Sequence, residues 1–196
     1  MRSFLFLLFL LMLNLPAEAA VVLLPVNPII QKTDFCGEAS VAMILTYYGT
    51  PISQDDVHTR IFKLPANGRG AYSTEIVSKL KTAGYALTVE NDYPLSDRNT
   101  MPQSTVTRLL AIVRKAIDAQ QPVLFGWYPK KEIENDFFGH FSVITGYDDA
   151  GLFIIDPRYS DLIYMKDSQM QHYLPLPTLD FSRWGFYLVI IQRSKP

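Results

Sequence analysis

Four stretches in the first two thirds of the chain carry apolar residues at helical spacing. The first has Ala39, Ala42, Met43 and Tyr47 on one side, and Gly49 follows, where a glycine accommodates the left-handed conformation that ends a helix. Serine or threonine residues precede the other three stretches and predict N-caps. We therefore expect further helices at residues 54 to about 62, at 73 or 74 to about 83, and at 104 or 105 to about 120.

Strand-like patterns dominate the rest of the chain. Alternating or continuously apolar runs predict strands at 85–89, 122–128, 140–147, 151–156, 162–165 and 184–191. The runs at 140–147 and 151–156 flank Asp148-Asp149-Ala150-Gly151, a turn sequence that predicts a β-hairpin. Helices come mainly first and antiparallel strands last, which indicates the α+β class. A loop at 64–72, with Pro65, Gly68 and Gly70, is expected to border a cleft.

The first 19 residues have the pattern of a secretory signal peptide. Arg2 precedes an unbroken apolar run from Phe4 to Leu13, and Ala17-Glu18-Ala19 is a small-x-small cleavage signal. The run is short for a membrane span, although an uncleaved anchor is the alternative. We expect cleavage after Ala19, a single domain at 20–196, no stable membrane insertion afterwards, and a periplasmic or secreted protein.

Composition excludes several function classes. The chain has 196 residues, 48% of them hydrophobic, and a formal net charge of −1, so nothing suggests a nucleic-acid partner. The three histidines, His58, His140 and His172, lack the spacing of metal ligands, and we expect no metal and no cofactor. His58 lies among polar neighbours, and we expect it on the surface.

Cys36 is the only cysteine and lies just before or at the start of the first helix. Unpaired N–H groups and the helix dipole favour a negative charge there, so a thiol should ionise more readily than a free one and act as a nucleophile. The alternative is a small buried apolar residue. An exported protein meets an oxidising compartment, where a lone thiol is a liability unless it is buried or used; this favours a functional Cys36.

A base and a carboxylate are predicted at one edge of the hairpin. His140 opens its first strand and Asp156 ends the second, and paired antiparallel strands bring these two positions together. A carboxylate that orients an imidazole beside a thiol is the arrangement of a nucleophilic triad. The alternative is that His140 only begins a strand and that Asp156-Pro157 is only a turn. Asp148 and Asp149 lie at the far end of the hairpin and are not expected to take this role.

Several linked motifs resemble the bacteriocin-processing, double-glycine-leader type of papain-like cysteine peptidase. They are Gln31 through Cys36-Gly37 to Tyr47-Tyr48-Gly49, then Gly139-His140, Thr145-Gly146-Tyr147-Asp148-Asp149 and Asp156-Pro157. The resemblance implies a papain-like fold, with the Cys36 helix packed on a C-terminal antiparallel sheet. It also implies Cys36 as nucleophile, His140 as general base and acid, Asp156 as its orienter, and Gln31 as part of an oxyanion hole with the Cys36 backbone N–H.

Members of this family cut leader peptides, often after two glycines, and many are fused to exporters. The resemblance therefore implies a peptide or protein substrate and a partner in an export or cell-surface system; we expect a free-standing, exported version. Two features depart from the family pattern. Gln31 lies five positions before Cys36 rather than six, and Phe35 occupies the place of a common acidic residue. Double-glycine specificity is therefore not carried over.

Three functions follow from these residues. The first is a cysteine peptidase that forms an acyl-enzyme at Cys36. The second is an amidase or transpeptidase that uses the same Cys36, His140 and Asp156 on another substrate or acceptor. The third is an inactive peptidase fold that binds a secreted peptide or protein. We favour the peptidase.

Overall fold

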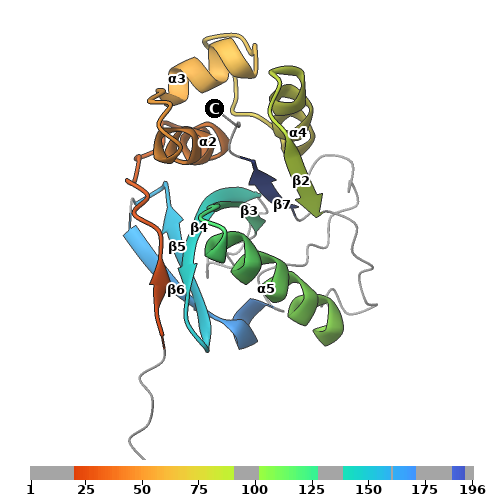
Figure 1. Cartoon of the computed structure of the whole chain (residues 1–196). Coiled ribbons are helices and arrows are strands. Elements are labelled where there is room, and N and C mark those ends of the chain that lie inside the picture. The colour runs from red at the N-terminus through yellow and green to blue at the C-terminus, as the bar shows by residue number, and fades with distance from the viewer. Residues whose placement is uncertain (1–19, 91–101, 128–138, 160, 171–186, 193–196) are drawn as a thin grey trace, which may run out of the picture.

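The computed structural model describes residues 20–90, 102–127, 139–159, 161–170 and 187–192. Within these ranges, seven strands form one antiparallel sheet in the order β2-β7-β3-β4-β5-β6, and β1 pairs with β4 beside this path. Three helical elements gather over one end of the sheet and a long helix lies across it (Figure 1). The expected α+β class and papain-like fold are confirmed.

The bounds of the helical elements are as follows. They are α2 (Cys36–Tyr47), α3 (Gln54–Asp56) with the π-helical turn η2 (Val57–Ile61), α4 (Ser73–Thr82), α5 (Gln103–Asp118) and the short 3-10 turn η3 (Asp167–Gln169). Gly49 and Gly84 have φ of +88° and +92°, as expected for glycines that end helices α2 and α4. The Ser53 hydroxyl accepts a hydrogen bond from the Asp56 N–H at 3.1 Å, which confirms the predicted cap of α3.

The strands follow the predicted order closely. They are β1 (Val22–Leu23), β2 (Leu87–Glu90), β3 (Val123–Trp127), β4 (His140–Tyr147), β5 (Gly151–Asp156), β6 (Asp161–Lys166) and β7 (Tyr187–Ile191). The hairpin β4–β5 is present, with Val143 opposite Ile155 and Tyr147 opposite Leu152. β1 was not predicted as a strand, and it pairs with the far end of β4, where β3 no longer runs alongside. The predicted signal peptide and His172 lie outside the described residues.

Helix α2 is the central helix of the fold. All residues from Gly37 to Leu45 are buried, because the helix packs on β4 and β3 below and against α3 and η2 above. Helix α5 is instead amphipathic and buries one face on β4 and β3. Cys36 is therefore fixed at the N-terminus of an enclosed helix, directly beside the strand that His140 begins.

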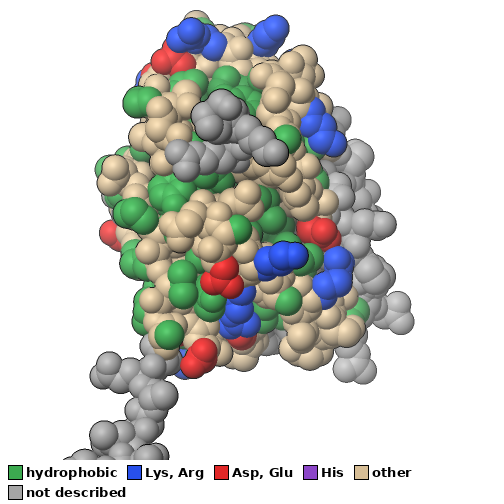
Figure 2. Space-filling model, viewed as in Figure 1, with side chains coloured by type: hydrophobic (Ala, Val, Ile, Leu, Met, Phe, Trp, Pro, Cys, Tyr) green, Lys and Arg blue, Asp and Glu red, His purple; other side chains and the backbone are tan. Residues whose placement is uncertain are grey.

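The outer surface carries charges of both signs. On the face shown in Figure 2, lysine and arginine side chains are interspersed with aspartate and glutamate rather than gathered into one region. Within the part of the chain that the structure describes, no helix is long and apolar enough to cross a membrane.

Candidate active site

Cys36 is the first residue of α2, as the sequence predicts. It is partly exposed and lines a pocket together with Gln31 and His140. The next residue, Gly37, is required by close packing: a Cβ there would lie 2.6 Å from Cδ1 of Ile76 and 3.5 Å from the Phe141 ring. A small residue after the cysteine therefore lets α2 start in contact with α4 and β4.

His140 and Asp156 lie together at the edge of the sheet that the hairpin predicts. His140 Nε2 is 2.6 Å from Asp156 Oδ1, and both side chains are buried. Asp156 Oδ1 also accepts a hydrogen bond from the Arg158 N–H at 2.9 Å. Burial by itself would raise the pKa of Asp156, but the hydrogen bond and charge of His140 outweigh it and hold that pKa below its ordinary value.

This pair fixes the tautomer of the histidine. An ionised Asp156 has no proton to give, so Nε2 of His140 must carry the hydrogen of the bond. In the neutral ring, Nδ1 is then the unprotonated nitrogen. The imidazole thus has one nitrogen held by the carboxylate and the other free of a proton, and His140 and Cys36 line the same pocket.

The Cys36 thiol is not acidic in the resting site. Although the residue as a whole is partly exposed, desolvation of its thiol raises the pKa of Cys36 to about 11, against backbone hydrogen bonds from Phe141 and Gly37 that lower it. The expectation that this thiol ionises more readily than a free one is therefore wrong for the site without substrate, because desolvation outweighs the helix N-terminus. A thiolate here requires a partner that takes the proton.

Gln31 reaches the same pocket despite the short spacing to Cys36. Its backbone N–H donates to the Pro157 carbonyl at 2.8 Å, which ties the segment before the cysteine to the end of β5. Its side-chain Oε1 is buried and has no hydrogen-bond partner among the described residues. Asp34 takes a φ of 63° between Gln31 and Cys36, which shortens the path between them.

Two neighbouring residues were not predicted from the sequence to belong to the site. Trp127 lies opposite His140 in the β3–β4 register, with its ring 6.2 Å from the imidazole. Trp127 Nε1 donates to the Ser142 hydroxyl at 2.9 Å. The aromatic ring therefore shields one side of His140, and only strand register, which the sequence does not specify, could have indicated this.

His58 is the clear error of the sequence analysis. It was expected on the surface, but its side chain is only 1% exposed, and Nδ1 lies 2.8 Å from Oε1 of the equally buried Glu38. The Phe35 ring stacks on the imidazole, with centroids 4.5 Å apart. Polar neighbours in the sequence gave no sign of this burial, because the cover is supplied by residues far away in the chain.

Part of the pocket wall comes from the loop that was expected to border a cleft. Arg69, Gly70, Ala71 and Tyr72 line the pocket, and Arg158 also lines it. The loop approaches the cysteine segment very closely: a Cβ on Gly70 would lie 1.7 Å from the Asp34 carbonyl oxygen. Glycine is needed there for space.

Comparisons with known proteins agree with this geometry. Residues 23–175 match the model of the Peptidase_C39 like family. Comparison with curated proteins gives no significant match. Among solved structures, a protein from Bacillus anthracis described as a C39-like peptidase is similar at 17% identity and a TM-score of 0.58, over 90% of this chain and all of that one.

The peptidase domain of Streptococcus ComA, a bi-functional ABC transporter involved in a quorum-sensing pathway, is also similar. It matches at 20% identity and a TM-score of 0.52, over 85% of this chain and 96% of that one. At these identities, the structural likeness supports the fold alone. The family match covers most of the chain, and the protein therefore belongs to the C39-like family of cysteine peptidases.

Proposed function

We propose that the protein is an exported hydrolase that cleaves peptide bonds through Cys36, His140 and Asp156. The observation that carries this proposal is the 2.6 Å bond between His140 and Asp156, because it leaves Nδ1 unprotonated in a histidine that lines the same pocket as the only cysteine. Export is supported by the N-terminal sequence pattern.

The raised pKa of Cys36 indicates how the reaction starts. Because burial keeps the thiol protonated, His140 Nδ1 takes the proton as Sγ attacks the substrate carbonyl carbon, rather than from a thiolate formed in advance. Asp156 stays ionised and stabilises the imidazolium that results. The carbonyl oxygen becomes an oxyanion, for which the Cys36 backbone N–H and the Gln31 amide are the candidate donors.

The remaining steps restore the residues. The tetrahedral intermediate collapses, the C–N bond breaks, and the imidazolium of His140 gives its proton to the leaving amine. The acyl group is then a thioester on Cys36. A water molecule, deprotonated by His140, attacks the thioester and releases the carboxylic acid, and Sγ recovers its proton.

The direct test is to incubate the protein with a library of peptides and identify new termini by mass spectrometry. Cleavage that disappears in both Cys36→Ala and His140→Ala supports the proposal. Cleavage that persists in either variant would contradict it. An added amine separates the related reaction: products joined to the amine would identify transpeptidation, whereas free acids identify hydrolysis.

The alternative is a binding role without catalysis, with which the raised pKa of Cys36 is compatible. On that account Cys36→Ala retains full function in the producing cell and no peptide in the library is cut.

Export has its own test. Fractionation of the cell with N-terminal sequencing should give a mature chain that begins at Ala20, outside the cytoplasm; an intact Met1 in the cytoplasm would contradict it.

A further inference from the structure

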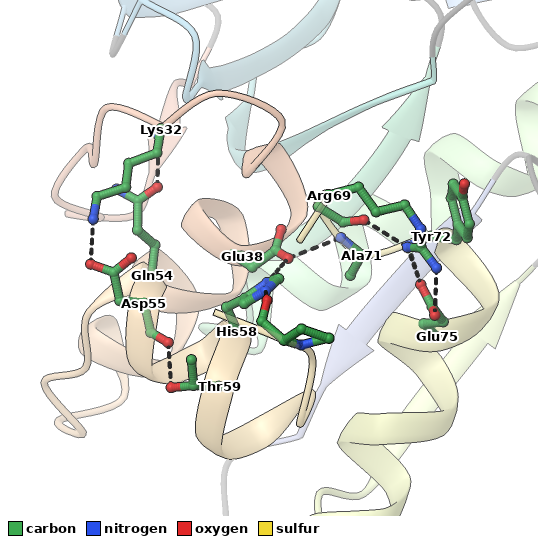
Figure 3. A network of polar contacts seen from close by, with 12 residues as sticks. Lys32, Glu38, Gln54, Asp55, His58, Thr59, Arg69, Ala71, Tyr72 and Glu75 are labelled. Carbon is green, nitrogen blue, oxygen red and sulfur yellow. Dashed lines mark hydrogen bonds and ion pairs between the residues drawn. The ribbon is translucent and has the colours of Figure 1, made fainter. Parts of the chain in front are cut away.

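Glu38 and His58 form a buried pair that the proposed reaction does not use. Glu38 lies in the first turn of α2, two residues after Cys36, and His58 lies on η2. Nδ1 of His58 is 2.8 Å from Glu38 Oε1, and the exposed fractions of the two side chains are 1% and 0%. Figure 3 shows this pair between the cysteine helix and the loop that leads to Tyr72.

The hydrogen bonds indicate that the pair is charged. His58 Nε2 lies 2.9 Å from the Pro65 carbonyl oxygen, which can only accept, so Nε2 carries a hydrogen. On the other side, Glu38 Oε1 receives both His58 Nδ1 and the Ala71 N–H, at 2.8 and 2.9 Å. In a neutral pair Oε1 would be the hydroxyl oxygen that donates to Nδ1, and such an oxygen is a poor acceptor for the Ala71 N–H; a carboxylate oxygen accepts both donors. We take Glu38 as the anion and His58 as the cation.

Burial works against this charge. It raises the pKa of Glu38, and the hydrogen bond from His58 opposes the rise. Glu38 Oε2 is buried and has no hydrogen-bond partner among the described residues. A buried carboxylate of this kind is tolerated only while its cation is present.

The pair also holds the wall of the pocket. The Ala71 N–H bonds to Glu38, and the Tyr72 N–H bonds to Glu75 Oε2 of α4 at 2.8 Å. Arg69 also holds this segment. Its guanidinium donates two hydrogen bonds to the Glu75 carboxylate, at 2.7 and 2.9 Å, and its Cζ lies 3.5 Å from the centroid of the Tyr72 ring. As Figure 3 shows, two carboxylates from two different helices thus hold one short segment, and this segment lines the same pocket as Cys36.

The charge of Glu38 also reaches the nucleophile. Burial is the main reason that the pKa of Cys36 is raised, and the nearby Glu38 charge adds to the rise. Four other charged groups lie in this region. Arg69 is paired with Glu75 and is also attracted by the charge of Glu38, and Asp34 and Arg158 line the pocket. Of the described groups, His58 is the cation in direct contact with Glu38.

We propose that Glu38 and His58 are positioning residues with two linked tasks. The pair holds the Gly70–Tyr72 wall against the start of the Cys36 helix, and His58 offsets part of the negative charge that Glu38 presents to the reacting sulfur. This proposal rests on the proposed role of Cys36 as nucleophile.

The charge claim is tested by the rate of Cys36 alkylation with iodoacetamide at pH 8. In His58→Gln the carboxylate loses its cation, so the thiolate is disfavoured and the rate should fall about tenfold, which corresponds to about one pKa unit. In Glu38→Gln the negative charge is gone, so the rate should be at least that of wild type. The double variant Glu38→Gln/His58→Gln should likewise return to at least the wild-type rate.

The return in the double variant is the decisive result. A purely structural role for His58 predicts that the loss persists, because the bond to the Pro65 carbonyl is still absent. Equal rates in His58→Gln and wild type, or a double variant as slow as His58→Gln, would overturn the charge claim. Circular dichroism checks each fold; if His58→Gln does not fold, recovery of folding in the double variant supports the claim and its absence overturns it.

The wall claim is tested by single-residue hydrogen exchange measured by NMR. Glu38→Ala should expose the Ala71 amide and speed its exchange by roughly tenfold or more, while Glu38→Gln, which keeps an acceptor, should not. Glu75→Ala is the matched control, since it should release the Tyr72 amide and leave that of Ala71 protected. Unchanged exchange at Ala71 in Glu38→Ala would overturn the claim.

Failure of the proposed function would be recognised separately. It would appear as alkylation that does not depend on His140, whereas the comparisons above are made among variants that all retain His140. The exchange measurement does not involve catalysis at all.

Discussion

The bond between His140 and Asp156 decides which imidazole nitrogen can act as a base. The sequence predicted this pair correctly, because a short hairpin fixes the relation between the start of one strand and the end of the next. The Glu38–His58 pair could not be predicted in this way. Its two members are 20 positions apart, and their burial depends on how the segment at 62–71 folds over α2.

Asp156→Asn tests the orienting role. An asparagine carries no charge to stabilise the imidazolium and can donate to the ring, which would place the hydrogen on Nδ1. We expect iodoacetamide to alkylate Cys36 at pH 7 roughly tenfold more slowly or worse in this variant. Asp161→Asn is the matched control, since Asp161 is exposed and pairs with Asp156 across the β5–β6 ladder. Equal rates in the two variants would contradict the orienting role.

At the scale of elements, the hydrophobic pattern was enough to predict most helices and strands. The core helix α2 and the hairpin β4–β5 were expected at nearly their observed positions, because each is delimited by glycine or turn residues. The two-residue strand β1 was not expected, since it exists only through pairing with β4. A helix was expected at 54 to about 62, but not that its second part, η2, is π-helical.

The sequence could not reveal how closely the loop that contains Gly70 approaches the segment that contains Asp34. Gly70→Ala would place a Cβ 1.7 Å from the Asp34 carbonyl oxygen, so backbone must move beside Cys36. We expect a loss of unfolding free energy of several kcal/mol, as found for severe steric strain. Gly84→Ala is the control: it has a φ of +92° but no atom within 4 Å of the new Cβ, so the loss should be about 1 kcal/mol.

Urea unfolding followed by circular dichroism compares the two glycine variants. An equal loss of unfolding free energy in both variants would mean that the backbone at Gly70 shifts at little cost and that the pocket wall is not tightly positioned. A larger loss in Gly70→Ala should be accompanied by slower Cys36 alkylation, because Asp34 lies in the segment that leads into the cysteine helix.

At the scale of the whole molecule, the sheet and α2 carry the site as one enclosed unit. The fold class followed from the order of helices and strands, whereas the resting ionisation of Cys36 did not, because burial at the helix start depends on the complete fold. This is why the predicted acidity of the thiol was wrong although its position was right.

Global stability should depend on pH through Asp156. Its folded pKa is lowered, so it contributes stability above its unfolded pKa of about 3.9 and loses it as the pH falls through the folded value. The destabilisation caused by Asp156→Asn should therefore be larger at pH 7 than at pH 3, as measured by urea unfolding. Asp161→Asn should show no such difference; a pH-independent effect of Asp156→Asn would contradict this account.

The central claim is that His140 takes the proton of Cys36. Its most direct test is the rate of Cys36 alkylation by iodoacetamide between pH 6 and pH 9, in wild type and in His140→Ala. The account predicts a rate at pH 7 at least roughly tenfold higher in wild type, because burial raises the pKa of the thiol to about 11 and only His140 is placed to take its proton as Sγ reacts. Equal rates across this range would contradict it.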